Sequence, residues 1–283
     1  MYKKSELYGP RVKGDIDLGL EPSRIVTTQL AITGRDLARI NTPGGLLPGG
    51  TPQDVYTPTV AQNYRMGSRR VMDDRVFHYG LATEALIRMM GALNQNQWPI
   101  NGALVTPVIA GDLTITVPDA VGAVNAYAGG WVVLNTAPMQ MRRILGNDVS
   151  DGVEVICYVD GAFELGAIAG TWVTGYPSIY SNIQAPPAVA PDYCSFVCVP
   201  LCTVPINNFF WGETWGPCYL VADSTVPGST ANARDVFFAT SGNLLAGGVP
   251  PGLAPIGMQR AGYLLPRTAF GNGDQLFMLQ LQP

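Results

Sequence analysis

Glycine and proline make up about a fifth of this chain, contributing 33 and 23 of its 283 residues. Glycine weakens helices and strands from within, and proline removes a backbone donor, so both gather in turns between short elements. Long helices are nearly excluded at this density of glycine and proline. The sequence has no strict repeat, so it is not collagen-like. We therefore predict an all-β fold: a sandwich or barrel of short antiparallel strands with one short helix and an extended N-terminal arm.

Strand patterns begin at about residue 104. Leu113–Val117 alternates apolar and polar residues between two turn signals. Asp160-Gly161 is a hairpin signal that follows the β-branched segment Val153–Val159. Further strands are expected at Trp131–Leu134, Met139–Leu145, Ala162–Leu165, Tyr193–Val204, Cys218–Ala222, Val236–Thr240 and Gln275–Gln282. The spacing favours a sandwich or barrel over alternating strands and helices.

The expected helix runs from Thr83 to about Leu93. Leu86, Met89, Met90 and Leu93 recur at i, i+3, i+4 and i+7, which is the spacing of one helical face. Thr83 is a suitable residue to cap its start.

The N-terminal region differs from the rest of the chain. Residues 1–62 show no sustained period and contain the Gly- and Pro-rich run Pro43–Pro52, which cannot hold regular structure. We predict an extended arm that crosses the surface of its own domain or of a neighbour, with a partly disordered tail as the alternative. Residues 63–283 form the predicted β-rich domain, with a candidate division into two subdomains near residues 185–192.

Charged residues are scarce, at 13% of the chain against roughly 25% in an ordinary soluble domain. From Gly166 to Gly212, 47 residues carry a single formal charge, Asp192. Lysine occurs only at positions 3, 4 and 13, although proteins commonly use it to solvate surfaces and to blunt strand edges. The uncharged segment is expected to be covered either by its own fold or by a neighbouring chain, and the scarcity of lysine suggests surfaces that contact other proteins. A composition bias of the source genome is the alternative.

Net charge and hydropathy exclude two classes of partner. A net charge of −4 and a pI of about 5.0 argue against binding driven by nucleic-acid phosphates. No apolar run reaches the roughly 18 residues needed to span a bilayer. The first residues include lysines but no following hydrophobic segment, so we do not expect a signal peptide.

The five cysteines are Cys157, Cys194, Cys198, Cys202 and Cys218. Three are spaced by four, which in a strand would place them on one face. Structural zinc usually needs close pairs that are closed by a second pair, and this spacing supplies none. We expect buried thiols in a reduced compartment, with no metal and no disulfide framework.

Candidates for catalysis are few. The single histidine, His78, has Ser68, Asp73 and Asp74 nearby in the sequence, but a structural or interface role suits it better. Glu154 and Glu164 flank the Asp160-Gly161 hairpin, where a sugar-cleaving carboxylate pair is conceivable, but no aromatic stacking partners accompany them. No phosphate loop, nucleophile elbow or metal-protease motif is present. We predict no catalytic residues, no cofactor and no enzymatic activity.

Basic residues fall into two groups that are candidate assembly contacts. The first lies near the N-terminus and comprises Lys3, Lys4, Arg11 and Lys13. The second comprises Arg65, Arg69, Arg70 and Arg75. Arginine tolerates the partial burial of an interface, while mixed charges on a short segment also suit a solvated face. Both interpretations stay open.

Five aromatic residues fall within the eleven residues 209–219. If this segment stays extended, alternation places Phe209, Trp211 and Trp215 on one face. These three are candidates for an aromatic surface or for a core, and core packing is favoured over a binding platform.

Several motifs together carry a resemblance to a known class of protein. They are Arg75–Tyr79, Gly129–Asn135, Arg142–Asn147, the hairpin at Asp160-Gly161, Asn208–Cys218 and the last strand, Gln275–Leu281. In this order, over about residues 64–283, the chain resembles structural proteins of tailed-bacteriophage virions, and within these the capsid decoration or cement (minor capsid) type. The long N-terminal arm and the insertion at Ala185-Pro186-Pro187 depart from simpler members.

The resemblance implies a non-enzymatic protein that stabilises a viral shell by bridging neighbouring capsid subunits. Its partners would be the major capsid protein and copies of itself, in a homo-oligomer such as a trimer, with no nucleic acid and no membrane. It would be assembled in the host cytoplasm and lie on the capsid surface of the virion. The alternative is a carbohydrate- or receptor-binding β-module on the virion surface or tail that uses Trp211 and Trp215. A hydrolase is a third hypothesis, which the single histidine weakens.

Overall fold

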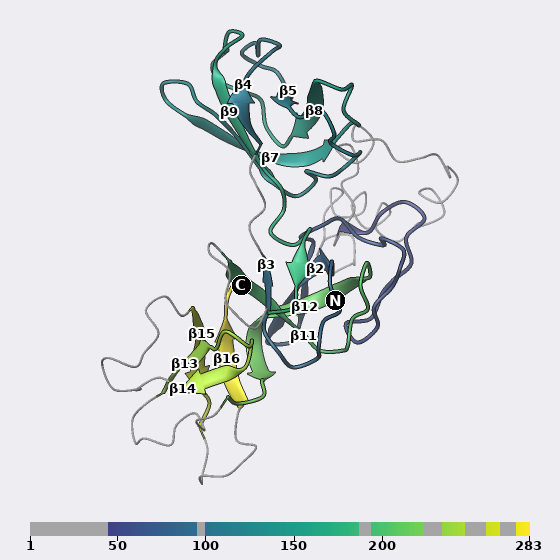
Figure 1. Ribbon diagram of the computed structural model, residues 1–283, viewed down its shortest axis with the longest axis vertical. Helices are drawn as coiled ribbons and strands as arrows, with labels where there is room; N and C mark the ends of the chain where they lie inside the picture. Colours follow the sequence, from purple (N-terminus) through teal and green to yellow (C-terminus); the bar gives the residue numbers. More distant parts are fainter. Residues whose placement is uncertain (1–44, 95–99, 187–193, 224–233, 247–258, 267–275) are drawn as a thin grey trace, which may run out of the picture.

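The computed structural model describes residues 45–94, 100–186, 194–223, 234–246, 259–266 and 276–283. Nearly all of their regular structure is β-strand, which confirms the predicted all-β fold. The strands form one sheet of ten and one of six (Figure 1), and every strand pairing is antiparallel.

The ten-stranded sheet has the order β10-β3-β11-β12-β16-β15-β13-β14, and the β1–β2 hairpin pairs with β12 through β2. Its strands are β1 (Arg69–Met72), β2 (Arg75–Leu81), β3 (Ala92–Asn94), β10 (Ile183–Gln184), β11 (Ser195–Pro200), β12 (Phe209–Tyr219), β13 (Asp235–Phe238), β14 (Leu244–Ala246), β15 (Arg260–Leu264) and β16 (Leu276–Gln280). Three apolar clusters fill it, around residues such as Phe210, Phe238 and Trp211.

The six-stranded sheet has the order β4-β9-β6-β7-β8-β5. Its strands are β4 (Ile100–Ala103), β5 (Thr114–Pro118), β6 (Trp131–Leu134), β7 (Gln140–Asn147), β8 (Glu154–Val159) and β9 (Trp172–Tyr176). The sheet curls until its edge strands approach: a Cβ atom on Gly102 of β4 would lie 2.7 Å from Cγ of Pro118 on β5. One apolar cluster, which includes Val132, Ile144 and Val173, fills the concave side.

The six-stranded sheet is an insertion into the other one. All its strands lie between β3 and β10, which pair directly in the ten-stranded sheet through Asn94 and Ile183. β10 and β11, on either side of the candidate boundary at residues 185–192, belong to the same sheet. The strands therefore change sheet between β3 and β4 and again between β9 and β10.

Of the predicted arm, residues 1–44 lie outside the described residues. The part that is described packs on its own domain. Thr59 forms a β-bridge with Phe209, and the amide of Gln53 donates hydrogen bonds to the carbonyls of Thr57 and Phe209 at 2.8 and 3.0 Å. Val55 is 1% exposed. The backbone of this segment is thus held by the ten-stranded sheet.

The prediction of a helix from Thr83 to Leu93 is wrong. Leu86 exchanges backbone hydrogen bonds with Val204, and the N–H of Met89 donates to the carbonyl of Pro200. Met89 has a φ of 59°, which no right-handed helix accommodates, and Leu93 lies in β3. Leu86 and Leu93 are both buried, so the apolar spacing reflects burial against distant strands.

The strand expected at Ala162–Leu165 is also absent. The side-chain carbonyl of Gln140 accepts the N–H groups of Glu164 and Leu165 at 2.7 and 3.1 Å. A side-chain amide thus takes the place of a partner strand.

Candidate functional site

The outer side of the six-stranded sheet carries exposed aromatic residues. Directly paired residues of antiparallel strands point to the same side, and Trp131 pairs with Tyr176 while Val133 pairs with Met141. Trp131, Tyr176 and Met141 are 43%, 44% and 56% exposed, and Trp172 on β9 is 48% exposed. We call these five residues the outer aromatic face.

The opposite side of the same strands is already filled. Val132, Leu134 and Val173 alternate with the outer residues and are fully buried in the core. An antiparallel sheet with one buried side normally presents polar residues on the other. Strands that are apolar on both sides are typical of sheets covered twice, and a contiguous apolar patch marks an interaction surface.

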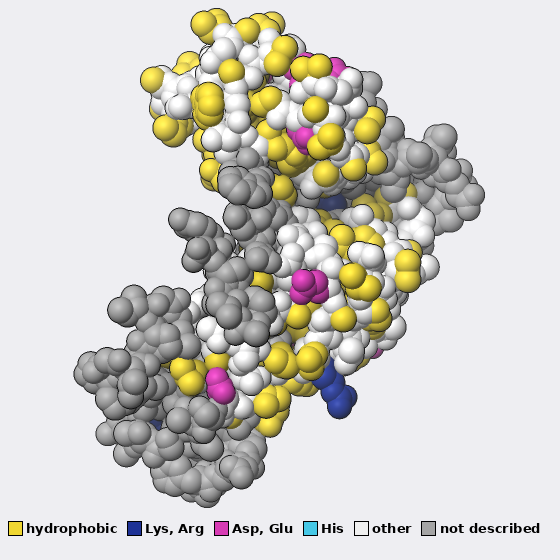
Figure 2. Space-filling view, in the orientation of Figure 1, with side chains coloured by type: hydrophobic (Ala, Val, Ile, Leu, Met, Phe, Trp, Pro, Cys, Tyr) yellow, Lys and Arg dark blue, Asp and Glu magenta, His cyan; other side chains and the backbone are white. Residues whose placement is uncertain are grey.

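Charge is sparse on this surface. β6 and β9 contain no ionisable acid or base except Tyr176, and Arg143 of β7, which pairs directly with Trp131, is the charged residue at its edge. Figure 2 shows hydrophobic side chains gathered over the six-stranded sheet with few charged side chains among them. Charged side chains resist the dehydration of a protein interface, so their scarcity favours one here.

A polar contact fixes one indole of the outer aromatic face. The ring N–H of Trp172 donates to the side-chain oxygen of Asn101 on the neighbouring strand β4. The hydroxyl of Thr174 donates to the same oxygen at 3.0 Å. Trp172 is therefore held on the surface in one orientation, which reduces the entropy lost when a partner covers it.

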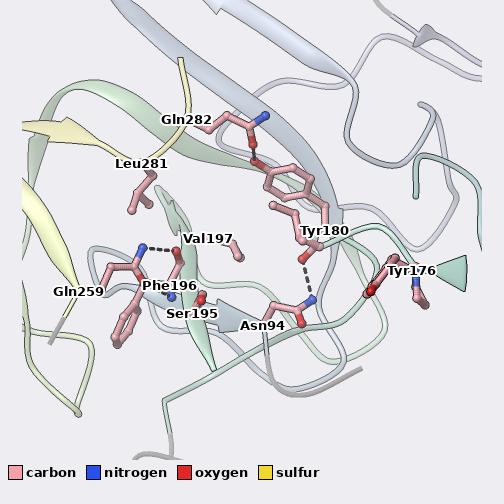
Figure 3. A pocket seen from close by; sticks show the side chains of 11 residues that line it. Asn94, Tyr176, Tyr180, Ser195, Phe196, Val197, Gln259, Leu281 and Gln282 are labelled. Carbon is pink, nitrogen blue, oxygen red and sulfur yellow. Dashed lines mark hydrogen bonds between the residues drawn. The ribbon is translucent and has the colours of Figure 1, made fainter. Parts of the chain in front are cut away.

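A neutral pocket of about 440 Å³ lies where the two sheets meet. Asn94 donates to the carbonyl of Ile179 at 2.7 Å, Tyr180 donates to Gln282 at 2.5 Å, and Gln259 donates to the carbonyl of Phe196 at 2.9 Å (Figure 3). These hydrogen bonds hold the polar side chains of Asn94, Tyr180 and Gln259 in place around the pocket.

A smaller pocket of about 260 Å³, which we call the arginine pocket, is also built by both sheets. It is lined by Gly67, Arg69, His78, Gly129, Trp131, Arg143, Ser178, Ile179, Tyr180, Gln282 and Pro283. It adjoins the outer aromatic face through Trp131, which belongs to both.

His78 lies at the inner wall of the arginine pocket and is 3% exposed. Its Nδ1 lies 3.0 Å from the hydroxyl of Thr214, and its ring stacks on Tyr180 with the centroids 4.8 Å apart. Burial, and then the charges of Arg69 and Arg143, lower the pKa of His78 to about 4. The imidazole is therefore neutral at pH 7. Neither neighbour is a carboxylate that would orient it for catalysis.

Glu213 on β12 is the other unusual ionisable group, with 0% exposure. Burial raises the pKa of Glu213 to about 8, while the charge of Arg75 opposes the shift. A guanidinium nitrogen of Arg75 lies 3.9 Å from one carboxyl oxygen. The thiol of Cys218 is near the carboxyl, but no hydrogen bond of normal geometry reaches either oxygen. The Glu213 side chain is only 1% exposed to solvent.

The prediction that Phe209, Trp211 and Trp215 share a face is wrong, because β12 contains a bulge between Glu213 and Trp215. The extra residue shifts the alternation, so that Cys218 lies on the buried side and Trp215 on the other. Trp211 is 1% exposed and packs against Tyr64 and Tyr79. Trp211 is thus a core residue, whereas Phe209 and Trp215 are half-buried.

The arginines of the predicted assembly group have separate environments. Arg70 donates to the carbonyl of Gln53 at 2.7 Å and lies over the ring of Trp211. Arg75 approaches Glu213, and burial, then the charge of Arg143, lowers the pKa of Arg65. Arg69 lines the arginine pocket. The other predicted group, Lys3, Lys4, Arg11 and Lys13, lies outside the described residues.

Sequence reasoning missed Trp131, Trp172 and Arg143 as candidate site residues. The two tryptophans are 41 positions apart, and register alone brings their strands together. One signal was available: in Trp131–Leu134 all four residues are apolar, without the outward polar positions of an ordinary antiparallel strand.

Comparisons with protein-family models, with curated proteins and with solved structures find no match. Among the described residues, no group of three or more His, Cys, Asp or Glu side chains could hold a metal ion. No helix in this part of the chain has the length and apolarity needed to cross a membrane.

Proposed function

We propose that this chain is a non-enzymatic structural component of a virus particle, a capsid decoration or cement protein that stabilises the shell by bridging neighbouring capsid subunits. The outer aromatic face carries the proposal. It exposes Trp131, Trp172 and Tyr176 on a sheet whose other side is already filled. Tryptophan, tyrosine and methionine are enriched where protein partners dock, and tryptophan most often dominates the binding energy.

Composition and resemblance supply the viral context. Low charge and the absence of lysine after position 13 suit a chain whose surfaces are covered in an assembly. The motif order over residues 64–283 resembles phage decoration proteins. The proposed partners are the major capsid protein and further copies of this chain, and the proposed location is the outer surface of the virion.

The test is binding of the purified protein to virus shells that lack it. Replacing Trp131 and Met141 together by glutamine removes apolar area from the outer aromatic face, and we expect affinity to fall at least about tenfold. The matched control replaces Val71 and Ile87, which are exposed elsewhere at 53% and 59%, and should bind like wild type. Equal binding by both double variants would contradict the proposed docking face.

The second candidate is a carbohydrate- or receptor-binding β-module. The observation that favours it is the oriented indole of Trp172 beside the amide of Asn101 and the hydroxyl of Thr174, since aromatic faces and amides bind sugars. Trp211 is buried and cannot serve this role. Glycan binding by wild type without any binding to shells would favour this alternative.

A further inference from the structure

The arginine pocket brings two cationic side chains together from different sheets. Arg69 lies on β1 and Arg143 on β7, and both line the pocket. A terminal nitrogen of Arg143 lies 3.8 Å from the point where a Cβ atom on Gly67 would lie, and the hydroxyl oxygen of Ser178 lies 3.5 Å from the same point. The guanidinium of Arg143 and the hydroxyl of Ser178 thus approach each other above the backbone of Gly67, and Arg69 lines the same pocket.

Neither of these cations pairs with an acidic side chain in the described part of the chain, and Pro283, the last residue of the sequence, also lines the pocket. None of the ion pairs there involves Arg69 or Arg143. Asp160 accepts a hydrogen bond from the backbone N–H of Arg143 and not from its guanidinium. Both charges lower the pKa of His78, which lines the same pocket. Two like charges that line one pocket repel, and an anion between them would reduce that repulsion.

The shape of the pocket suits a small ligand. Gly67 and Gly129 have φ angles of 72° and 80°, a backbone conformation that favours glycine, so no side chain fills the wall at either position. Trp131 adds an indole. A volume of about 260 Å³ is just below the usual range of about 300–1,000 Å³ for small-molecule sites. One compact group fits, whereas a chain segment does not.

We propose that the arginine pocket binds a carboxylate group, held by the guanidinium groups of Arg69 and Arg143 with the hydroxyl of Ser178. Arginine presents two parallel N–H donors that match the two oxygens of a carboxylate. The carboxylate belongs either to an acidic sugar, whose ring would lie beside Trp131, or to an acidic side chain of a partner protein. Recognition of the anion is the same in both cases.

Calorimetric titration of the full chain tests the proposal with three probes: glucuronate, N-acetylglutamate and neutral glucose. We expect at least one of the two acids to bind and glucose not to bind. Arg69→Gln combined with Arg143→Gln should weaken acid binding at least about tenfold. Arg88→Gln, which removes one exposed charge away from the pocket, should leave it unchanged.

The titration results distinguish the source of the carboxylate and test whether the pocket binds one. Binding of glucuronate alone assigns the site to acidic sugars, and equal or tighter binding of N-acetylglutamate assigns it to an acidic side chain. Wild-type affinity in the double variant, or no binding by either acid, overturns the proposal. Arg143→Lys keeps the positive charge but loses the two parallel N–H donors. We therefore expect its affinity for the acid to lie between those of wild type and the double variant. Arg69 and Arg143 are exposed and make no side-chain hydrogen bonds in the described structure, and an unchanged melting temperature verifies that the variants fold.

Discussion

Glu213 is a carboxyl group that the fold keeps protonated at neutral pH. It lies in the middle of β12 with 0% exposure, and its pKa is about 8 because burial disfavours the charge. An unfolded chain would ionise it near its ordinary value of 4.5. Between these two values the folded state holds a proton that the unfolded state releases, so stability falls as pH rises from about 4.5 to 8.

Glu213→Gln should remove this dependence on pH. The wild-type free energy of unfolding should lose up to about 1.4 kcal/mol per pH unit through this group, while the variant should lack that slope. Urea unfolding between pH 6.5 and 8 measures the difference. This window avoids His78, whose lowered pKa costs stability only as pH falls below about 6.5.

The control for Glu213→Gln is Glu164→Gln, because the Glu164 side chain is 84% exposed. It should keep the wild-type slope. Equal slopes in Glu213→Gln and wild type would show that Glu213 is ionised in the folded protein.

The core residues of the aromatic segment were partly predictable. The sequence favours core packing for residues 209–219, and Trp211 is buried. Its directly paired neighbour on β2 is the aromatic Tyr79. The side on which Trp215 lies was not predictable, since a bulge depends on the partner strand. Trp131 and Arg143 belong to a site only through pairings that no local pattern encodes.

Strands were predicted best where alternation is sharp and turns are close. Trp131–Leu134 and Leu113–Val117 correspond to β6 and, within a residue, to β5. The expected helix at Thr83–Leu93 failed because helical spacing can also arise when buried residues pair with distant strands. Leu86 pairs with Val204, 118 positions away. Tertiary contacts therefore override local periodicity in such segments.

The β15–β16 pair depends on a glycine. Gly262 has a φ of 153°, and a Cβ atom there would lie 1.8 Å from the carbonyl oxygen of Met278. Gly262→Ala should therefore destabilise the protein by at least about 2 kcal/mol, since the backbone must shift to relieve both clash and strain.

Gly175→Ala on β9 is the matched control for Gly262→Ala. Its nearest atoms would be 3.8 Å away, an ordinary contact, so its stability should stay within about 1 kcal/mol of wild type. Denaturant unfolding compares the two variants. Equal stabilities would contradict the described pairing of β15 with β16.

The six-stranded sheet is inserted into the ten-stranded sheet, and this topology explains why the site could not be predicted from local sequence patterns. The chain leaves the ten-stranded sheet after Asn94 and returns at Ile183, with the whole six-stranded sheet between them. Both pockets lie where the sheets meet, so their linings combine segments from several parts of the chain. Composition predicted the all-β class, whereas this topology depends on pairings over almost 90 residues.

Our central proposal is that this protein docks on a viral shell through the outer aromatic face of the six-stranded sheet. Imaging of purified particles at near-atomic resolution tests it most directly. We predict density for this chain on the outer surface of the shell, contacting at least two shell subunits, with Trp131 and Trp172 buried in the contact. Density in the tail, absence from the particle, or a shell contact that leaves both tryptophans exposed would contradict the account.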